Sequence, residues 1–242
     1  MAQNIYDDPH FHAGYSQLPR SIAGLDAMPE WPAMRALLPP LAGQRVVDLG
    51  CGFGWFCRWA QEEGACEVLG FDLSARMLAR AREMTVGTTV SYAQADLETL
   101  TLPEAVFDLA YSALALHYLR DLDRMFEMIH RALLPRGRLV FSIEHPIYMA
   151  SRKAGWIETA DGRRVWPVDS YQMEGERITD WLAPGVVKIH RTLGTLLNAL
   201  IAAGFTIRHV QDWGPTDAQL AAQPSLAEER ERPTFLLVAA TR

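Results

Sequence analysis

The stretch from Val46 to Gly54, Val-Val-Asp-Leu-Gly-Cys-Gly-Phe-Gly, constrains this chain more than any other part of it. A short apolar run ends in Asp48 and leads into three glycines at alternate positions, and a helical pattern begins at Trp55. Glycines let the backbone turn sharply and approach a ligand closely, and a helix N-terminus attracts polar groups. The stretch therefore predicts a strand, a glycine-rich turn and a helix that bind a nucleoside-type cofactor.

The spacing of the three glycines distinguishes two kinds of cofactor. The dinucleotide fingerprint reads Gly-x-Gly-x-x-Gly, whereas here Gly50 and Gly52 are followed by Gly54, one residue too early. This difference counts against NAD or FAD as the ligand. A nicotinamide-dependent dehydrogenase stays an alternative that NAD binding would support.

Strand-like and helical patterns alternate over residues 44–143. Strands are expected over Arg45–Leu49, Glu67–Phe71, Thr88–Ala93, Phe107–Ser112 and Arg138–Ile143, and helices over Trp55–Glu63, Ser74–Met84 and 121–134, the last of which Pro135-Arg136-Gly137 is expected to end. Such alternation predicts an α/β fold, a parallel sheet with helices on both faces. Ligands of these sheets bind at the carboxyl ends of the strands, where the glycine loop lies.

Two segments depart from this alternation. Residues 1–42 are rich in proline and aromatic residues and predict an N-terminal arm with one or two short helices. Residues 146–191 contain two turn signals, Asp161-Gly162 and Pro184-Gly185, each between extended segments, which predicts two hairpins.

The α/β pattern returns in the last part of the chain. A helix is expected from Leu193 to Ile201 with Gly204 as its C-cap, followed by the strand Phe205–Trp213, an acidic, alanine-rich loop and the strand Thr234–Ala240. No long helix joins these two strands, so we expect an antiparallel pair. We divide the chain into an arm or cap (1–42), a core (43–145), a lid insert over the acceptor site (146–191) and the C-terminal part of the core (192–242).

Charge and composition exclude several classes of protein. The net charge is −6 and the basic residues occur in short pairs, so nucleic acid is not an expected partner. The three cysteines form no CxxC pair, so no metal site is expected. No apolar run reaches the ~20 residues of a membrane span, and the N-terminus does not resemble a signal peptide, so we expect a cytoplasmic protein without a membrane partner.

Acidic residues follow successive strands of the predicted sheet. Asp72 comes at the end of the second strand, 18 residues beyond Gly54, where a carboxylate accepts hydrogen bonds from ribose hydroxyls. Asp96 follows the third strand. Because the carboxyl ends of parallel strands meet at one edge, both side chains are expected near the glycine loop.

These motifs, taken in order, resemble those of class I S-adenosylmethionine-dependent methyltransferases. Val47-Asp48-Leu49-Gly50-Cys51-Gly52-Phe53-Gly54 is similar to the family's first motif, and Phe71-Asp72-Leu73-Ser74, Ala95-Asp96-Leu97, Phe107–Ser112 and the turn from Leu134 to Leu139 resemble the motifs that follow. The resemblance covers residues 40–145 well and 193–240 more loosely. It implies a Rossmann-like, seven-stranded mixed sheet with its last strand antiparallel, and S-adenosylmethionine as the cofactor.

The resemblance also implies roles for the residues of the first and fourth strands. Gly50 and Gly52 would pass beneath the methionine part of the cofactor. Asp48 would orient the loop or approach the amino group, and Ser112 would lie near the methionine end. The alternative for Asp48 and Asp96 is that they only cap turns and do not bind the cofactor.

The adenosine part of the cofactor would meet the second and third strands. By the same resemblance, Asp72 would hold both ribose hydroxyls and Leu73 would pack on adenine. Asp96 would accept from the adenine amino group, and the backbone of Leu97 would meet a ring nitrogen.

The arm supplies a separate hypothesis, because related methyltransferases often close an N-terminal segment over the cofactor. Arg20 would clamp the methionine carboxylate, since a guanidinium matches a carboxylate in shape and charge, and Tyr15 would cover the site. The alternative for Arg20 is an ordinary surface position.

Methyl transfer requires alignment of the reactants, and a base only where the acceptor loses a proton. His145 is the first choice for this base and His190 the second, with His117 and Glu144 also near the expected mouth. His117 is interpreted as packing beside the cofactor.

The lid insert is rich in aromatic residues. These are Tyr148, Trp156, Trp166, Tyr171 and Trp181. They would form either an apolar pocket for the acceptor or a small core that attaches the insert to the sheet.

The sequence thus predicts a methyltransferase that acts on a small organic acceptor. Three alternatives stay open besides the dehydrogenase. One is an RNA methyltransferase, another a protein methyltransferase, and the third a protein that binds S-adenosylmethionine without transferring the methyl group. The oligomeric state, monomer or homodimer, is left open.

Overall fold

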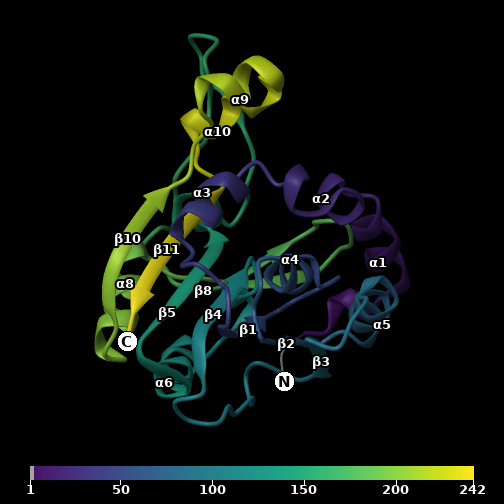
Figure 1. Cartoon of the computed structure of the whole chain (residues 1–242). Helices are drawn as coiled ribbons and strands as arrows, with labels where there is room; N and C mark the ends of the chain where they lie inside the picture. Colours follow the sequence, from purple (N-terminus) through teal and green to yellow (C-terminus); the bar gives the residue numbers. More distant parts are fainter. Residues whose placement is uncertain (1–2) are drawn as a thin grey trace.

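A seven-stranded sheet runs through the middle of the computed structural model, which describes residues 3–242 (Figure 1). Its strands are β1 (Arg45–Leu49), β2 (Glu67–Asp72), β3 (Val90–Gln94), β4 (Phe107–Ala113), β5 (Leu133–Glu144), β10 (Thr206–Asp212) and β11 (Phe235–Thr241). Their order is β10-β11-β5-β4-β1-β2-β3; β11 pairs antiparallel with both β10 and β5, and the other neighbouring strands of this sheet pair in parallel. The predicted seven-stranded mixed sheet with an antiparallel last strand is confirmed.

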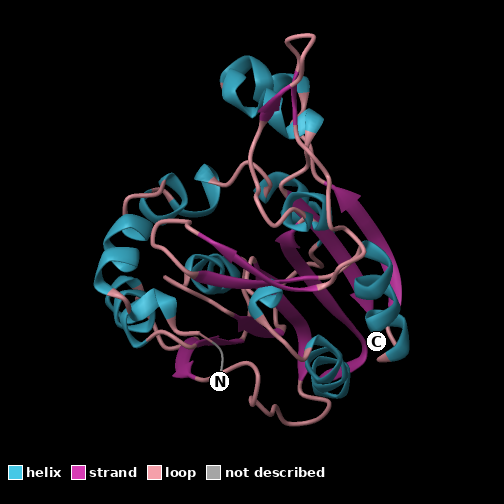
Figure 2. Ribbon diagram, turned by 180° about the vertical axis from the view of Figure 1, so that it is seen from behind, coloured by secondary structure: helices cyan, strands magenta, loops and turns pink. Residues whose placement is uncertain are grey.

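Helices cover both faces of the sheet (Figure 2). They are α3 (Trp31–Leu37), α4 (Trp55–Glu62) and α5 (Ala75–Met84) on one face, and α6 (Leu122–Ala132) and α8 (Leu193–Ala202) on the other. Val46 and Val47 are adjacent in β1 and fully buried, yet they pack in different apolar clusters because successive side chains of a strand point to opposite faces. The sheet therefore has one hydrophobic layer on each side.

Local sequence explains where these helices begin. Ser74 accepts a hydrogen bond from the backbone N–H of Met77 at 3.1 Å, as predicted for the N-cap of α5. Asp121 caps α6 in the same way through Arg124, at 3.0 Å. The C-cap of α8 is Ala203, one residue before the predicted Gly204. Gly204 follows it with a φ of 94°.

Two predictions about loops are wrong. Helix α6 ends at Ala132, and Pro135-Arg136-Gly137 lie within β5, where the pairing of β5 with β4 shifts register. Leu133 pairs with Phe107, so the strand starts early and the turn residues form an irregularity inside it. The acidic loop before β11 contains α9 (Asp217–Ala222) and α10 (Glu228–Glu231).

The N-terminal arm is more helical than predicted. Besides α3, it contains α1 (Pro9–Ser16), α2 (Pro19–Ile22) and the 3-10 turns Ile5–Asp7 and Gly24–Ala27. Met1 and Ala2, also part of the predicted arm, lie outside the described residues. Figure 1 shows α1 beside α5, so the arm runs along the edge of the fold that carries the ends of β2 and β3.

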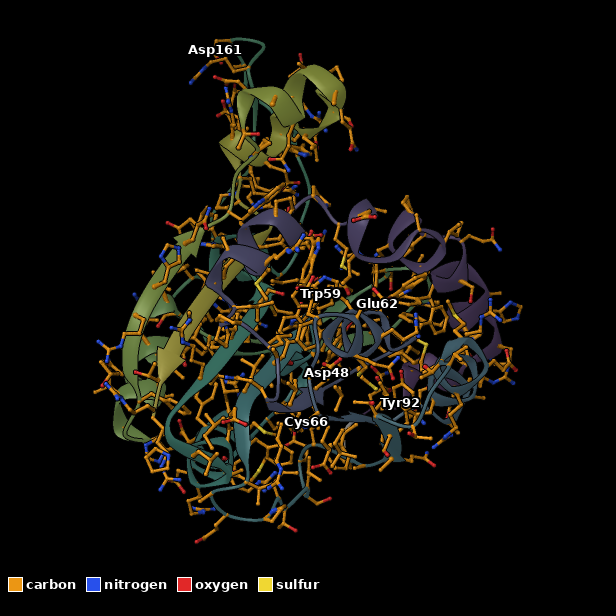
Figure 3. The ribbon with its side chains drawn as sticks, viewed as in Figure 1. Asp48, Trp59, Glu62, Cys66, Tyr92 and Asp161 are labelled. Carbon is orange, nitrogen blue, oxygen red and sulfur yellow. The ribbon has the colours of Figure 1, made fainter. Side chains whose placement is uncertain are left out.

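The insert forms the two predicted hairpins after the short helix α7 (Pro146–Ala150). Strands β6 (Ile157–Glu158) and β7 (Arg164–Val165) pair antiparallel, as do β8 (Gly175–Thr179) and β9 (Val186–His190). The first hairpin projects beside α9 and α10, with Asp161 at its tip (Figure 3). None of the helices in residues 3–242 is long and apolar enough to span a lipid bilayer.

Candidate functional site

A cavity of about 390 Å³ lies at the carboxyl ends of the central strands. Most of the residues predicted to bind a cofactor line it, namely Tyr15, Arg20, Asp48, Gly50, Gly52, Asp72, Leu73, Asp96 and Leu97. The strand order reverses between β1 and β4, and parallel sheets bind ligands beside such a point. The topology thus gathers residues from three separate sequence motifs and from the N-terminal arm at one place.

The glycine loop after β1 is held against β2. The backbone N–H groups of Gly50 and Cys51 both donate to the carbonyl oxygen of Phe71, at 2.8 and 2.9 Å. Gly50 has a φ of 85°, and a Cβ there would lie 2.3 Å from the Cβ of Ala115. Both the left-handed backbone and the close approach require glycine at this position.

Asp72 is the carboxylate that fixes the loop from the side of β2. Its Oδ2 accepts from the N–H of Gly52 at 2.8 Å, and its Oδ1 accepts from the N–H of Ser74 at 2.9 Å. Burial is the largest influence on this group and raises the pKa of Asp72 to about 6, against the lowering effect of the two hydrogen bonds.

Asp48 lies in the centre of the molecule, at the end of β1 (Figure 3). The residue is 2% exposed, and the Sγ of Cys57 donates to its Oδ2 at 3.2 Å. Burial raises the pKa of Asp48 to about 7, and the charge of Asp72 adds to this shift. A buried carboxylate in the cavity wall is suited to a cationic or hydrogen-donating ligand group.

The segment after β3 is held in place by hydrogen bonds from Arg124 of helix α6. Arg124 of α6 donates from Nη2 to the carbonyl oxygen of Leu97 at 2.5 Å and from Nη1 to that of Leu100 at 3.0 Å. Asp96 accepts from the N–H of Glu98 at 3.0 Å, which shapes the same turn. Asp96 and Leu97 thereby hold a fixed place in the cavity wall.

The N-terminal arm closes one side of the cavity. Asp7 accepts from the Oγ of Ser74 and from the N–H of Arg76, the latter at 3.1 Å, so the arm attaches to the first turn of α5. The hydroxyl groups of Tyr6 and Tyr118 lie 3.2 Å apart. The arm therefore bridges the end of β2 and the loop after β4.

The arm also meets the second hairpin of the insert. The side chain of Gln3 donates to the carbonyl oxygen of Gly185 at 2.9 Å and accepts from the N–H of Val187 at 3.0 Å. The ring of Tyr15 lies edge-on to those of Phe53 and Trp181, with centroids 5.8 and 6.3 Å apart. Arm and insert thus form a common roof over the glycine loop.

Arg20 lines the cavity but also has a partner within the arm. Its Nη2 lies 2.9 Å from the Oε1 of Glu30, and its guanidinium lies over the ring of Phe235. The ion pair fixes the direction of the guanidinium. The predicted clamp on a ligand carboxylate stays a prediction.

The structure does not bring Ser112, His145 or His190 into the cavity wall. Ser112 donates to the carbonyl oxygen of Leu49 at 2.7 Å, and His190 has its Nε2 2.8 Å from the carbonyl oxygen of Tyr171. Each side chain has a hydrogen-bond partner inside the fold, so the geometry lends no support to its expected part in binding or catalysis.

His145 has the extended backbone predicted for a residue before proline, with φ −64° and ψ 140°. Its Nδ1 accepts from the N–H of Ile147 at 3.0 Å and caps α7, and its Nε2 lies 2.7 Å from Oδ1 of Asp212. Both ring nitrogens are therefore engaged. Its role as a base stays a prediction.

His117 and Glu144 do reach the cavity, from the ends of β4 and β5. Burial lowers the pKa of His117 well below its usual value, and the charge of Lys188 adds to this effect. The imidazole is therefore neutral near pH 7. Glu144 forms an ion pair with Lys188 of β9.

Further lining residues escaped the sequence reasoning. They include Tyr6, Leu18, Leu25 and Met28 of the arm, and Thr234 and Phe235 at the start of β11. No local motif marks them, because only the folding of the arm and of β11 onto the sheet edge brings them there. In residues 3–242 no group of three or more histidine, cysteine or acidic side chains is arranged to hold a metal ion.

Similarity to known proteins identifies the family of this chain. The family model "Methyltransferase domain" matches residues 47–141. An S-adenosylmethionine-dependent methyltransferase from Mesorhizobium loti is 62% identical, with a TM-score of 0.88 over 90% of this chain and 100% of that one. The chain belongs to the S-adenosylmethionine-dependent methyltransferases. A putative methyltransferase of this kind from Listeria monocytogenes is 37% identical, with a TM-score of 0.84 over 90% of this chain and 99% of that one.

Curated relatives with a named acceptor match only part of this methyltransferase. The malonyl-[acyl-carrier protein] O-methyltransferase of Enterobacter lignolyticus is 41% identical over 110 residues, which are 46% of this chain and 43% of that one. The chain thus spans less than half the length of that relative. The part that the two share does not include the whole roof formed by arm and insert.

The cavity of this methyltransferase fits its cofactor. Gly52 has a φ of 53°, and a Cβ there would meet only the end of Met77, so bare backbone lines the cavity at this point. Carboxylates of Asp72 and Asp48 stand beside this backbone. Hydroxyl and amino groups of S-adenosylmethionine are hydrogen-bond donors, which these groups match.

Proposed function

We propose that the chain transfers the methyl group of S-adenosylmethionine to a small organic acceptor. The observation that carries this proposal is the roof that the N-terminal arm and the insert form over the cavity. Gln3 reaches Gly185 and Val187, and Tyr6 reaches Tyr118, so two segments meet over the cavity. Aromatic side chains of both segments line the enclosed space, which suits a small molecule better than a folded macromolecule.

The cofactor would lie over β1, β2 and β3. Asp72 would bind the ribose hydroxyls, and Gly50 and Gly52 would pass beneath the methionine part. Leu73, Asp96 and Leu97, which share one cavity wall, would surround adenine. The fixed carboxylate of Asp72, which already accepts two backbone N–H groups, supports its part in this arrangement.

The arm would complete the cofactor site. Tyr15 would cover it, and Arg20 would hold the methionine carboxylate while Glu30 fixes the guanidinium. When bound, S-adenosylmethionine supplies a methyl group on a positively charged sulfur. The protein's own task is then to align the acceptor and to exclude water.

Calorimetric titration with S-adenosylmethionine tests the cofactor site. We expect the Asp72→Ala variant to bind at least about tenfold more weakly than the wild type, because charged hydrogen bonds to ribose are lost. Asp161→Ala is the matched control, since Asp161 lies at the tip of the first hairpin (Figure 3). Equal affinity of the Asp72→Ala variant would remove this residue from the ribose site.

The class of acceptor is tested with a labelled methyl group. The protein is incubated with methyl-labelled S-adenosylmethionine and a cell extract, and the extract is then separated into small molecules, protein and RNA. We expect the label in a small molecule other than S-adenosylmethionine, and only where the protein has been added. Label in protein or RNA would contradict the proposed acceptor class.

A further inference from the structure

The strand order divides the cavity into two halves. Asp72 and Asp96 follow β2 and β3 on one side of β1, whereas Glu144 ends β5 on the other side, beyond β4. Thr234 and Phe235, at the start of β11, line the cavity next to β5. If the cofactor lies over β1 to β3, as proposed above, the half that contains Glu144 is left for the acceptor.

Glu144 is held from behind by a buried cation. Its side chain is 15% exposed and forms an ion pair with Lys188, whose side chain is 4% exposed and is not part of the cavity wall. The Nζ of Lys188 also lies 5.2 Å from the ring centroid of Trp181. The ion pair fixes the side chain of Glu144 where it lines the cavity.

The second carboxylate oxygen of Glu144 is available. Within the described part of the chain, Oε1 binds Lys188, and Oε2 has no hydrogen-bond donor from the protein. The Oγ1 of Thr234 is buried and likewise has no partner among residues 3–242. Polar atoms left without a partner in a cavity wall are the groups expected to bind a ligand.

The charges of the wall disfavour an anionic acceptor. Asp48, Asp72, Asp96 and Glu144 are the acidic residues that line the cavity. Among the described residues, Arg20 is the one lysine or arginine in this wall, and Glu30 pairs with it. Lys188 lies outside this wall and is already paired with Glu144, so a carboxylate or phosphate beside Glu144 would meet acidic side chains and no unpaired cation among the described lining residues.

We propose that Glu144 selects the acceptor, which is an amine or a hydroxyl compound whose N–H or O–H group donates to Glu144 Oε2. This inference rests on the proposed function, because it concerns the same cavity. The rings of Tyr148, Trp181 and Phe235, which line the cavity, provide apolar surface for the body of such a molecule.

Glu144 would also stabilise the charge that develops during transfer. The nitrogen or oxygen of the acceptor forms a bond with the methyl carbon, the bond from that carbon to sulfur breaks, and its electron pair stays on sulfur. The acceptor atom gains positive charge and then releases its proton, through Glu144, to water. A fixed carboxylate next to this atom favours the charged state.

Four probes that share one ring test the selection. Benzylamine, benzyl alcohol, benzoate and phenyl phosphate are titrated into the protein saturated with S-adenosylhomocysteine, and transfer of a labelled methyl group to each is measured. We expect binding of the amine or the alcohol, and neither binding nor methylation of the two anions. Tighter binding of benzoate or phenyl phosphate, or binding of none of the four, would overturn the proposal.

Variants connect the selection to Glu144. We expect Glu144→Gln to weaken binding of the preferred probe about 10- to 100-fold, because a charge-assisted hydrogen bond is lost. The double variant E144Q/K188M removes both members of the buried pair, so it avoids leaving Lys188 as an unpaired charge, and we expect the same loss. Glu67→Gln, at the start of β2 and exposed, is the matched control.

Titration with S-adenosylmethionine on the same samples separates two failures. If the variants bind the cofactor as the wild type does and also retain the preferred probe, the inference about Glu144 is wrong and the proposed function stands. If the wild type binds no cofactor, the proposed function itself fails.

Discussion

Asp48 is a buried carboxylate whose charged form the ligand-free protein disfavours. Burial raises its pKa to about 7, whereas a carboxyl of an unfolded chain titrates near 4. The folded protein therefore holds a proton that the unfolded chain releases, so this residue makes the folded state less stable as the pH rises from about 4 to about 7. A cationic or hydrogen-donating ligand group next to Asp48 would offset this loss of stability.

We expect the substitution Asp48→Asn to stabilise the ligand-free protein at high pH. Asparagine does not ionise, so its advantage over aspartate should grow by about 2–3 kcal/mol between pH 5 and pH 8, as follows from a shift of this size. Urea unfolding at both pH values measures this difference. An advantage that is the same at pH 5 and pH 8 would contradict the burial of a charge at this position.

At the scale of single residues, the sequence predicts positions that the backbone itself dictates. Gly50 and Gly52 are recognisable because the loop needs glycine, and Asp72 because it ends a strand at a set spacing from the loop. Ser112, near the end of β4, and His145, just after β5, have similar places in the sequence, yet they bind partners inside the fold. Which side of a strand end a side chain occupies depends on packing that one sequence does not reveal.

Asp7 attaches the N-terminal arm to the start of helix α5. Asp7 accepts from Ser74 and from the N–H groups of Arg76 and Ala75, at the start of α5. Asp72 is the last residue of β2, two positions before Ser74. Attachment of the arm and the shape of the cofactor site are therefore joined through one short segment.

We expect Asp7→Ala to weaken binding of S-adenosylmethionine about five- to tenfold, because losing a helix cap costs about 1 kcal/mol and the arm detaches from α5. The calorimetric affinity measures this effect, and the rate of cofactor dissociation should rise with it. Asp26→Ala, exposed in the same arm, is the control. An unchanged affinity would show that the arm contributes nothing to the cofactor site.

Regular elements were predicted from the sequence, and irregular ones were not. Hydrophobic periodicity and caps suffice for α5 and for most strands of the sheet. The extension of β5 through Pro135, Arg136 and Gly137 depends on pairing with β4 across a register shift, which overrides the usual meaning of these turn residues. The short helices α9 and α10 likewise depend on contacts that lie far away in the sequence, such as the bond from Gln219 to the carbonyl oxygen of Pro29.

For the whole molecule, the sheet was predictable because successive motifs each fix one strand end. The arm was expected to cover the cofactor and the insert to form a lid, but the contacts that join them were not foreseen, because these two parts flank the central core in the sequence and meet through single side chains. Gln3 and Tyr6 belong to no motif, and only their contacts with the second hairpin and with Tyr118 reveal their place.

We expect the cofactor to stabilise the whole fold. A ligand at 100 times its Kd adds about 2.7 kcal/mol to the free energy of unfolding, which raises the Tm of a chain of this size by about 5–10 °C. Thermal unfolding followed with and without S-adenosylmethionine measures the shift. Asp72→Ala at the same cofactor concentration should show a much smaller rise, and an equal rise would contradict the assignment of this residue.

The bonds from Gln3 to the second hairpin also set an order in time. They join residues 182 and 184 positions apart in the chain, so a segment translated earlier contacts one translated much later. Closing so long a loop costs more conformational entropy than forming local helices and hairpins does. A nascent chain therefore has the floor of the site well before it has the roof, and we expect firm retention of the cofactor to begin only after most of the protein has been translated.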